Sequence, residues 1–333
     1  MLIQREFDCW ELVVPAKVNL FLEVLGRRDD GYHDLDTVML AVSLCDRLRF
    51  RSTEEPELRL RVFSESTCGF TKLTGEDPAW EIPDDHSNLV IRALEALKLR
   101  FGVQKGMEID LFKAIPAQAG LGGGSANAAA AIIGGMLAWL GEFYEDVAGE
   151  LASGLGSDIN FFIEANANGI ECRNWLAHCV GRGELVKPIF SDWLLDMVVV
   201  HPPLGCATKD VFGRLRKSHL SDNSRVASDK LVHALEQRDR LALSKALFNR
   251  LGTPATTVNP WIDRIQEALA MDRSVLGNCL SGSGSAIIAL TENHEQSKQL
   301  ADRLKSHFPV RAFAVHSWQT RSITEQIKTI FRK

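Results

Sequence analysis

Hydrophobic residues in the first fifty positions fall into extended segments. Residues 12–14 together with 20–25, and then residues 35–44, are rich in Leu, Val and Phe, a composition typical of strands. The stretch between them contains Asp30-Gly31, a pair that favours a turn between strands. Residues 51–86 mix charges, prolines and short apolar runs, and we expect edge strands and loops there. The pattern predicts that the chain begins with two strands joined by a turn.

A helix, a strand, a glycine-rich run and a second helix follow. Residues 88–101 space their large apolar residues broadly at helical intervals, with charges on the other face. Residues 107–113 alternate apolar and polar positions, the period of a strand, and Pro116 closes this segment. Residues 126–140 carry no charge and are mostly Ala, Ile, Met, Leu and Trp, which predicts a helix buried on most sides.

The later half has its own elements after a crossing segment at residues 187–193. A strand is expected at 194–200, further strands at 276–280, 286–290 and 310–316, and helices at 208–216, 230–251, 259–269 and 294–306. Alternating strands and helices with a few antiparallel neighbours indicate the α+β class, with a sandwich of sheet and helices in each half. We therefore expect an N-terminal domain at residues 1–189 and a C-terminal domain at 190–333.

Composition narrows the class of protein. The chain has 333 residues, of which 45% are hydrophobic and 24% charged, so it is globular and long enough for two modest domains. Its net charge of -5 gives no electrostatic support for a nucleic-acid partner, so a small anionic ligand needs a local site. The seven scattered cysteines favour reduced thiols in a cytoplasm over a disulfide framework. We expect no secretory signal and no uncharged stretch of bilayer length, hence no membrane partner.

The run Gly120-Leu-Gly-Gly-Gly-Ser125 before the buried helix is the clearest chemical signal. A backbone without side chains can wrap closely around an anion and present several N–H groups to it. The positive end of the following helix adds to this attraction. Ser125 stands at the helix start, where its hydroxyl could meet a phosphate oxygen or a magnesium ion. The run therefore predicts a phosphate site, although an ordinary structural turn is an equal alternative.

Two common nucleotide motifs do not fit this run. The P-loop requires Gly-Lys-Ser/Thr at its end, but the run has no lysine. The dinucleotide pattern G-x-G-x-x-G fails because Ser125 stands where its last glycine belongs. A dinucleotide-dependent oxidoreductase is therefore disfavoured.

Three further segments each have a structural and a functional interpretation. In Pro15-Ala-Lys-Val-Asn-Leu20, Lys17 and Asn19 share one face of an extended segment, but an exposed strand lysine is the simpler explanation. Asp158 precedes an apolar segment and could be a helix cap. Ser281-Gly-Ser-Gly-Ser285 lies between two strand-like runs and could be a hairpin loop.

Together and in this order, the four segments resemble the superfamily of galactokinase, homoserine kinase, mevalonate kinase and phosphomevalonate kinase, the GHMP kinases. The resemblance includes Pro116-Ala-Gln-Ala-Gly-Leu-Gly-Gly-Gly-Ser-Ala126 and Gly156-Ser-Asp-Ile-Asn-Phe-Phe162 and extends over about residues 12–290. It implies a two-domain GHMP kinase fold, with a ribosomal protein S5 domain 2-like N-terminal domain and a ferredoxin-like C-terminal domain. It also implies an ATP-dependent kinase with an alcohol group as the phosphate acceptor.

Within the superfamily, the sequence resembles the 4-diphosphocytidyl-2-C-methyl-D-erythritol kinases of the methylerythritol phosphate pathway of isoprenoid (terpenoid) biosynthesis. The resemblance lies in Gly31-Tyr-His33 and in Pro202-Pro-Leu-Gly-Cys-Ala-Thr208 followed by Phe212. It implies that Tyr32 and His33 hold the cytosine of the substrate and that Phe212 completes an aromatic sandwich around it. The alternatives are another kinase of the superfamily, acting on mevalonate, homoserine or a sugar, and a non-catalytic nucleotide-binding regulator on the same fold.

The resemblance assigns roles to individual residues. Our hypothesis is that Asp158 orients and deprotonates the substrate hydroxyl, and that Lys17 lies beside it and helps to hold the γ-phosphate. Magnesium is expected to enter with ATP, with Ser125 as its one plausible protein ligand. The oligomeric state is expected to be a monomer or a homodimer. The expected ATP-binding residues are Lys113, Pro116, Gly120, Leu121, Gly122, Gly123, Gly124, Ser125 and Ala126, and the expected substrate-binding residues are Asn19, Tyr32, His33, Thr208 and Phe212.

The sequence departs from the family pattern in two places. Residues 164–171 stand where the family usually has a short Gly-Gly turn, which makes the stretch up to Gly181-Arg-Gly-Glu184 several residues longer. Gln118 and Ala119 replace smaller residues at the start of the glycine loop. We expect these departures to affect rate and affinity more than the class of reaction.

Overall fold

The computed structural model describes residues 1–66, 69–72, 82–164, 173–215 and 228–331. Of the inserted residues 164–171, all but Glu164 lie outside the described part of the chain.

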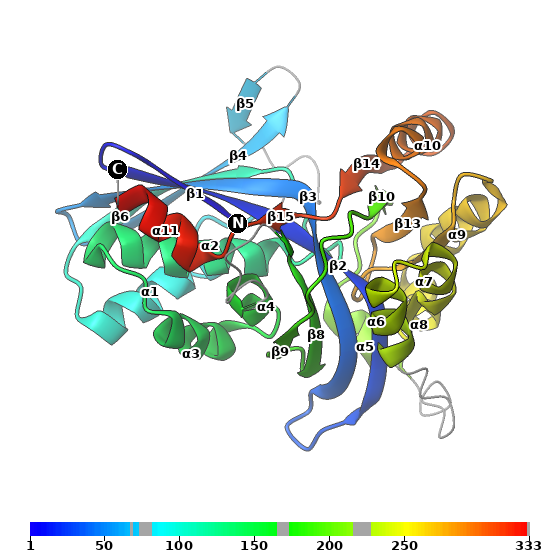
Figure 1. Cartoon of the computed structure of the whole chain (residues 1–333). Coiled ribbons are helices and arrows are strands. Elements are labelled where there is room, and N and C mark those ends of the chain that lie inside the picture. The colour runs from blue at the N-terminus through cyan, green and yellow to red at the C-terminus, as the bar shows by residue number, and fades with distance from the viewer. Residues whose placement is uncertain (67–68, 73–81, 165–172, 216–227, 332–333) are drawn as a thin grey trace.

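The N-terminal half is built on one large sheet. Its elements are the strands β1 (Leu2–Glu6), β2 (Cys9–Arg27), β3 (His33–Thr53), β4 (Leu58–Ser66), β5 (Gly69–Lys72), β6 (Gly106–Lys113), β8 (Leu176–Gly181) and β9 (Leu185–Pro188), and the helices α1 (Leu89–Phe101), α2 (Gly123–Leu140), α3 (Glu145–Leu155) and α4 (Ile159–Glu164). In the described residues the strands run in the order β1-β2-β3-β6-β4-β5, while β8 pairs with β3 and β9 with β8. The four helices gather on one face of this sheet (Figure 1).

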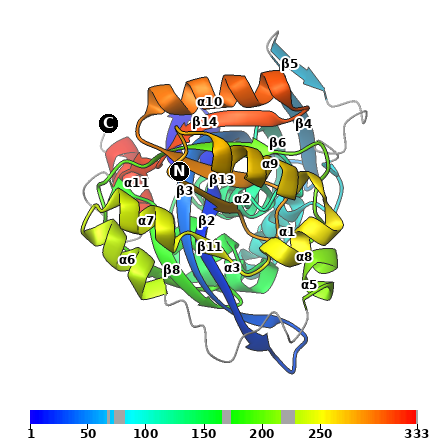
Figure 2. The same ribbon diagram turned by 90° about the vertical axis from the view of Figure 1, so that its right-hand side faces the viewer.

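The C-terminal half is a smaller antiparallel sheet between two apolar layers. Its elements are β10 (Asp196–His201), β12 (Gly277–Leu280), β13 (Ile287–Thr291) and β14 (Arg311–His316), with α5 (Thr208–Gly213), α6 (Ser228–Glu236), α7 (Arg240–Ala246), β11 (Phe248–Asn249), α8 (Gly252–Val258), α9 (Trp261–Met271) and α10 (His294–His307). The strand order is β12-β13-β10-β14. Helices α9 and α10 cover the outer face (Figure 2). Along β10, Met197 and Val199 pack into one core and Val198 and Val200 into another, which explains its unbroken apolar run.

Strands β2 and β3 connect the two halves. The sequence pattern predicted shorter segments, but β2 is a single strand of 19 residues and β3 one of 21 residues. Residues 14–24 of β2 are buried without interruption, because both faces of this part are covered. Early residues of β2 pack into the N-terminal core and later ones into the two cores of the C-terminal half. Both halves are thereby held on the same pair of strands.

One expected helix is divided. Residues 230–251 form α6, α7 and the short strand β11 instead of one helix. Arg238 has a φ of 52°, which interrupts the helix, and the Asp239 carboxylate caps α7 by accepting the N–H of Ala242 at 2.9 Å. Strand β11 then pairs in parallel with β2. Hydrophobic spacing could not show this break, because it continues through both helices.

Helix α2 contradicts the expectation that no uncharged stretch of the chain has bilayer length. By length and composition alone, this 18-residue helix could cross a membrane, yet 72% of it is buried inside the protein. Gly134 approaches the ring of Phe50 and Gly135 approaches Leu94 and Leu97. It is therefore the central core helix of the N-terminal half, as its lack of charge predicted.

The C-terminal end returns to the first half. Strand β15 (Gln319–Thr320) pairs with β7 (Arg173–Asn174), and helix α11 (Ile323–Phe331) places Ile323 and Ile327 in the N-terminal core. The domain boundary between residues 189 and 190 stays a prediction. The C-terminal residues of β15 and α11 pack against the N-terminal half, on the other side of that boundary.

Candidate active site

A cleft of about 1120 Å³ contains the predicted site. It is lined by β2 and β3, the glycine loop, the start of α1, residues 157–158, α5 and the loop between β12 and β13. All the residues that the sequence predicted line it except Ala126, which is fully buried in the core. Residues from the two halves thus meet in one place, although Lys17 and Phe212 lie far apart in the sequence.

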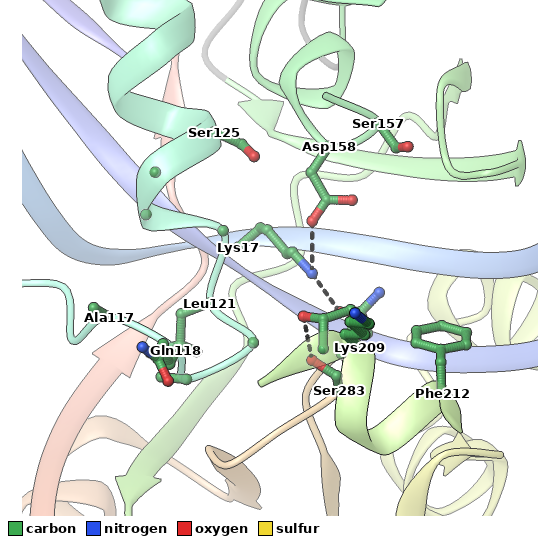
Figure 3. A pocket seen from close by; sticks show the side chains of 18 of the residues that line it. Lys17, Ala117, Gln118, Leu121, Ser125, Ser157, Asp158, Lys209, Phe212 and Ser283 are labelled. Atoms are coloured by element: carbon green, nitrogen blue, oxygen red, sulfur yellow. Dashed lines mark hydrogen bonds and ion pairs between the residues drawn. The ribbon is translucent and has the colours of Figure 1, made fainter. Parts of the chain in front are cut away.

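Lys17 and Asp158 form an ion pair inside the cleft. The Lys17 Nζ lies 3.2 Å from Asp158 Oδ2 and also donates to Asn19 Oδ1 at 2.7 Å (Figure 3). The lysine side chain is 4% exposed and that of the aspartate 30%. Within the described residues, Asp158 Oδ1 has no hydrogen-bond partner, so it is available to a ligand in the cleft.

Asn19 is fixed by the strand that lies beside it. Its amide donates to Thr37 Oγ1 at 2.8 Å, and Thr37 Oγ1 donates to the carbonyl of Phe21 at 2.6 Å. These hydrogen bonds orient the Asn19 carbonyl toward Lys17. The lysine is therefore held in one position before any ligand binds.

The glycine loop leaves the first turn of α2 open. Gly122 precedes the helix with a φ of 68°, and no side chain caps the free N–H groups of the first turn. A Cβ atom on Gly122 would lie 2.8 Å from Lys17 Cγ. Only glycine fits both the backbone angle and this space. The uncapped N–H groups and the helix dipole make this end of α2 suitable for an anion.

The second glycine segment supports the first. The Ser281 hydroxyl donates to the Gly120 carbonyl at 3.0 Å and accepts the Asn19 N–H at 3.2 Å. A Cβ atom on Gly120 would lie 2.1 Å from the Ser281 carbonyl oxygen. Residues 281–285 do connect β12 to β13, as the hairpin interpretation proposed, and they also hold the glycine loop against β2.

Lys113 lies under the glycine loop in a buried ion pair. It contacts Asp46, and neither side chain is more than 2% exposed. The other oxygen of Asp46 accepts the N–H groups of Ala114 at 2.8 Å and Ile115 at 2.9 Å. Asp46 thus fixes both the lysine and the backbone that leads into the loop. No pattern in the sequence singled out Asp46.

An aromatic wall closes the other end of the cleft. The rings of His33 and Phe212 are 4.9 Å apart at an angle of 32°, which is a direct contact between the two halves. Burial, and to a lesser degree the charge of Arg27, lowers the pKa of His33. The Tyr32 ring is more exposed and lies 5.0 Å from the Arg182 guanidinium. A base between His33 and Phe212 would have to separate these rings.

The chain is similar to known kinases over most of its length. Residues 88–162 match the GHMP kinases N terminal domain and residues 231–310 the GHMP kinases C terminal family. The 4-diphosphocytidyl-2-C-methyl-D-erythritol kinase of Rhodopirellula baltica is 36% identical over 314 residues, covering 89% of this chain and 91% of that protein. The chain belongs to this kinase family. The same enzyme of Pelotomaculum thermopropionicum is 36% identical, covering 87% and 92%.

Solved structures agree with this kinase fold. A crystal structure of 4-(cytidine 5'-diphospho)-2C-methyl-D-erythritol kinase has a TM-score of 0.69 and 29% identity, covering 92% of this chain and 99% of that one. Homoserine kinase of Cytophaga hutchinsonii also has a TM-score of 0.69, at 19% identity, covering 96% and 98%, which shows the fold alone. The predicted two-domain GHMP kinase fold is thereby confirmed.

The structure of this kinase adds cleft residues to which the sequence assigned no role. Arg182 and Lys209 line the cleft. Gln118, noted as a departure, also lines it with a φ of 51°, and its carbonyl accepts the Cys206 N–H at 3.1 Å. The start of the glycine loop is thereby attached to the C-terminal half. The signal for Arg182 was its place in Gly181-Arg-Gly-Glu184, but nothing in the sequence placed it beside Tyr32.

Proposed function

We propose that this kinase transfers the terminal phosphate of ATP to the 2-hydroxyl of 4-diphosphocytidyl-2-C-methyl-D-erythritol, a step of non-mevalonate isoprenoid precursor biosynthesis. The observation that carries the proposal is one cleft that combines an uncapped glycine-loop helix, a fixed Lys17–Asp158 pair and an aromatic wall. The uncapped helix start suits a phosphate, and the aromatic wall suits a planar base. The relatives that carry this enzyme's name cover most of the chain.

The charge of the cleft supports two phosphate-bearing ligands. Its described lining contains the cations Lys17, Arg27, Lys113, Arg182 and Lys209, whereas Asp158 is its one acid. The chain as a whole carries a net charge of -5. The positive charge is therefore concentrated where an anionic nucleotide and an anionic substrate have to meet.

The geometry suggests how each group acts in phosphoryl transfer. Phosphoryl transfer depends mainly on alignment and on neutralising the oxygens of the transferred group. Asp158 Oδ1 would accept the proton of the substrate hydroxyl and orient its oxygen. Lys17, held by Asn19, would contact both the carboxylate and the transferred phosphoryl group. The N–H groups at the start of α2 would bind the nucleotide phosphates.

Magnesium fits this site only as an ion carried by the nucleotide. Among the described residues, no group of three His, Cys, Asp or Glu side chains could hold a metal. The Ser125 hydroxyl lines the cleft in the first turn of α2 and would be the protein ligand. Magnesium binds largely through phosphates and water, and it would neutralise charge on the phosphate oxygens.

We also propose a cytoplasmic enzyme that acts on small molecules without a nucleic-acid or membrane partner, as a monomer or a homodimer. The thiols support a reducing compartment and a structural role. Cys9, Cys45, Cys179, Cys206 and Cys279 are free. Burial raises the pKa of Cys45 and of Cys279 to about 12, so both remain protonated and unreactive.

A substrate panel tests the function. ADP release would be measured with ATP and magnesium against 4-diphosphocytidyl-2-C-methyl-D-erythritol, mevalonate, homoserine and galactose. Turnover of the cytidyl substrate alone is expected. Asp158→Asn should lower kcat by about 10²–10⁴-fold, the contribution of a positioned general base, with the KM for ATP nearly unchanged. Unchanged kcat would remove Asp158 from the mechanism, and turnover of another alcohol would exclude the cytidyl assignment.

A further inference from the structure

Arg182 and Lys209 are cations of the cleft to which the mechanism above gives no role. Arg182 lies in the turn between β8 and β9, in the N-terminal half, and Lys209 is the second residue of α5, in the C-terminal half. Their side chains therefore approach the cleft from different halves of the protein. Lys17 and Lys113 are each held in an ion pair with an aspartate, whereas Arg182 pairs with Glu184 and Lys209 has no ion pair within the described residues.

Arg182 contacts Tyr32 and belongs to a turn that borders Asp158. Its guanidinium lies 5.0 Å from the centre of the Tyr32 ring, and its Nε is 3.4 Å from Glu184 Oε1. Arg182 is thus ion-paired to Glu184, but the terminal nitrogens of its guanidinium donate no hydrogen bond within the described residues. A Cβ atom on the next residue, Gly183, would lie 3.6 Å from Asp158 Oδ1. The turn that carries Arg182 is therefore adjacent to the proposed catalytic carboxylate.

Lys209 lies beside the loop that supports Asn19. The hydroxyl of the preceding residue, Thr208, is 3.0 Å from the Ser283 hydroxyl, and Figure 3 shows Lys209 next to Ser283 below the Lys17–Asp158 pair. Lys209 is exposed and makes no ion pair within the described part of the chain. Its charge is therefore available to a ligand.

We propose that Arg182 and Lys209 form a two-sided clamp for the diphosphate of the substrate and so favour a nucleoside diphosphate over the bare nucleoside. This inference rests on the proposed function. In that substrate the diphosphate connects the ribose of the cytidine to the polyol that carries the accepting hydroxyl. With the base at the aromatic wall and the hydroxyl at Asp158, the diphosphate has to lie between them, where these two cations are. A guanidinium can bind phosphate oxygens through two parallel hydrogen bonds, and an ammonium acts as a point charge.

A competing explanation gives Arg182 an indirect role. Its cation–π contact could serve only to hold the exposed Tyr32 ring in place. In that case, removing Arg182 weakens binding of the base itself, whether or not phosphates are attached. The clamp predicts instead that only ligands with phosphates lose affinity.

Cytidine and CDP separate these explanations because they share the base and differ in the diphosphate. Their dissociation constants would be measured by calorimetry on the full chain and on Arg182→Gln, Lys209→Gln and the double variant. Lys187→Gln is the matched control, because Lys187 is an exposed cation of β9 that does not line the cleft. The KM for ATP in each variant reports whether the fold of the nucleotide site is retained.

The clamp predicts that each cleft variant weakens CDP binding about tenfold, the scale of one charge-assisted hydrogen bond. Cytidine binding should change by less than about twofold, and the Lys187 control should match the unmodified chain for both ligands. Equal losses for cytidine and CDP in Arg182→Gln, or no loss for either, would overturn the clamp. If the unmodified chain binds neither ligand, the proposed function fails as well, so the two failures can be distinguished.

Discussion

The buried pair of Asp46 and Lys113 allows a quantitative test of how the glycine loop is supported. We consider the substitution Asp46→Asn. One carboxylate oxygen contacts the lysine, and the other accepts the N–H groups of Ala114 and Ile115. An asparagine oxygen can still accept both N–H groups. Its amide NH₂, however, would face the Lys113 ammonium and leave that charge buried without a partner.

The magnitude follows from the burial of both side chains. Removing one partner of a buried ion pair costs about 3–5 kcal/mol. For a unit of about the size of the N-terminal half, this corresponds to a fall in Tm of about 6–20 °C. Asp110→Asn is the control, since Asp110 lies on the same strand as Lys113 and pairs with the exposed Arg61 at 2.6 Å. Such a surface pair contributes about 0–1 kcal/mol.

Thermal unfolding of both variants and of the unmodified chain measures this difference. We expect Asp46→Asn to melt well below Asp110→Asn, and its KM for ATP to rise, because a Cβ atom on Gly123 would lie 3.1 Å from Lys113 Nζ at the start of α2. The KM for the alcohol substrate should change little. If the Tm of Asp46→Asn lies within about 2 °C of the control, a difference worth less than about 1 kcal/mol, the pair does not support the loop as argued.

Two further predictions concern the loop and the aromatic wall. Gly122→Ala should lower activity by about 10²-fold or more by displacing Lys17. The control is Gly141→Ala, at a similar φ of 71° but with open space around it, which should cost about 1–2 kcal/mol of stability and retain activity. Equal activity in the two variants would contradict the steric argument. Because Arg27 helps to lower the pKa of His33 below its usual 6.5, the folded state disfavours protonated His33, and stability from this group is lost as the pH falls. Arg27→Gln should therefore raise the pKa of His33. The substrate KM, measured between about pH 5 and 8, should then begin to rise at a higher pH than in the unmodified chain. An unshifted pH profile of KM would show that His33 does not titrate in binding.

Local signals predicted much of the architecture. The helix over residues 88–101, the strand ending at Lys113 and the uncharged buried helix each follow from periodicity or composition, because those properties depend on the environment of a single element. The division of residues 230–251 could not be read in this way. A backbone turn at Arg238 and pairing of β11 with β2 decide it, and the partner strand lies more than two hundred residues away.

The sequence by itself predicted which groups carry chemistry: the glycine loop, Lys17, Asp158 and the aromatic residues together resemble the motifs of one kinase family. Only the tertiary structure decided which other groups work with them. Asp46 beneath Lys113 and Arg182 over Tyr32 are ordinary charged residues in the sequence. Their importance comes from burial and from contacts between distant segments, since the energy of a charge depends on its surroundings and on its partner, neither of which is encoded in local spacing.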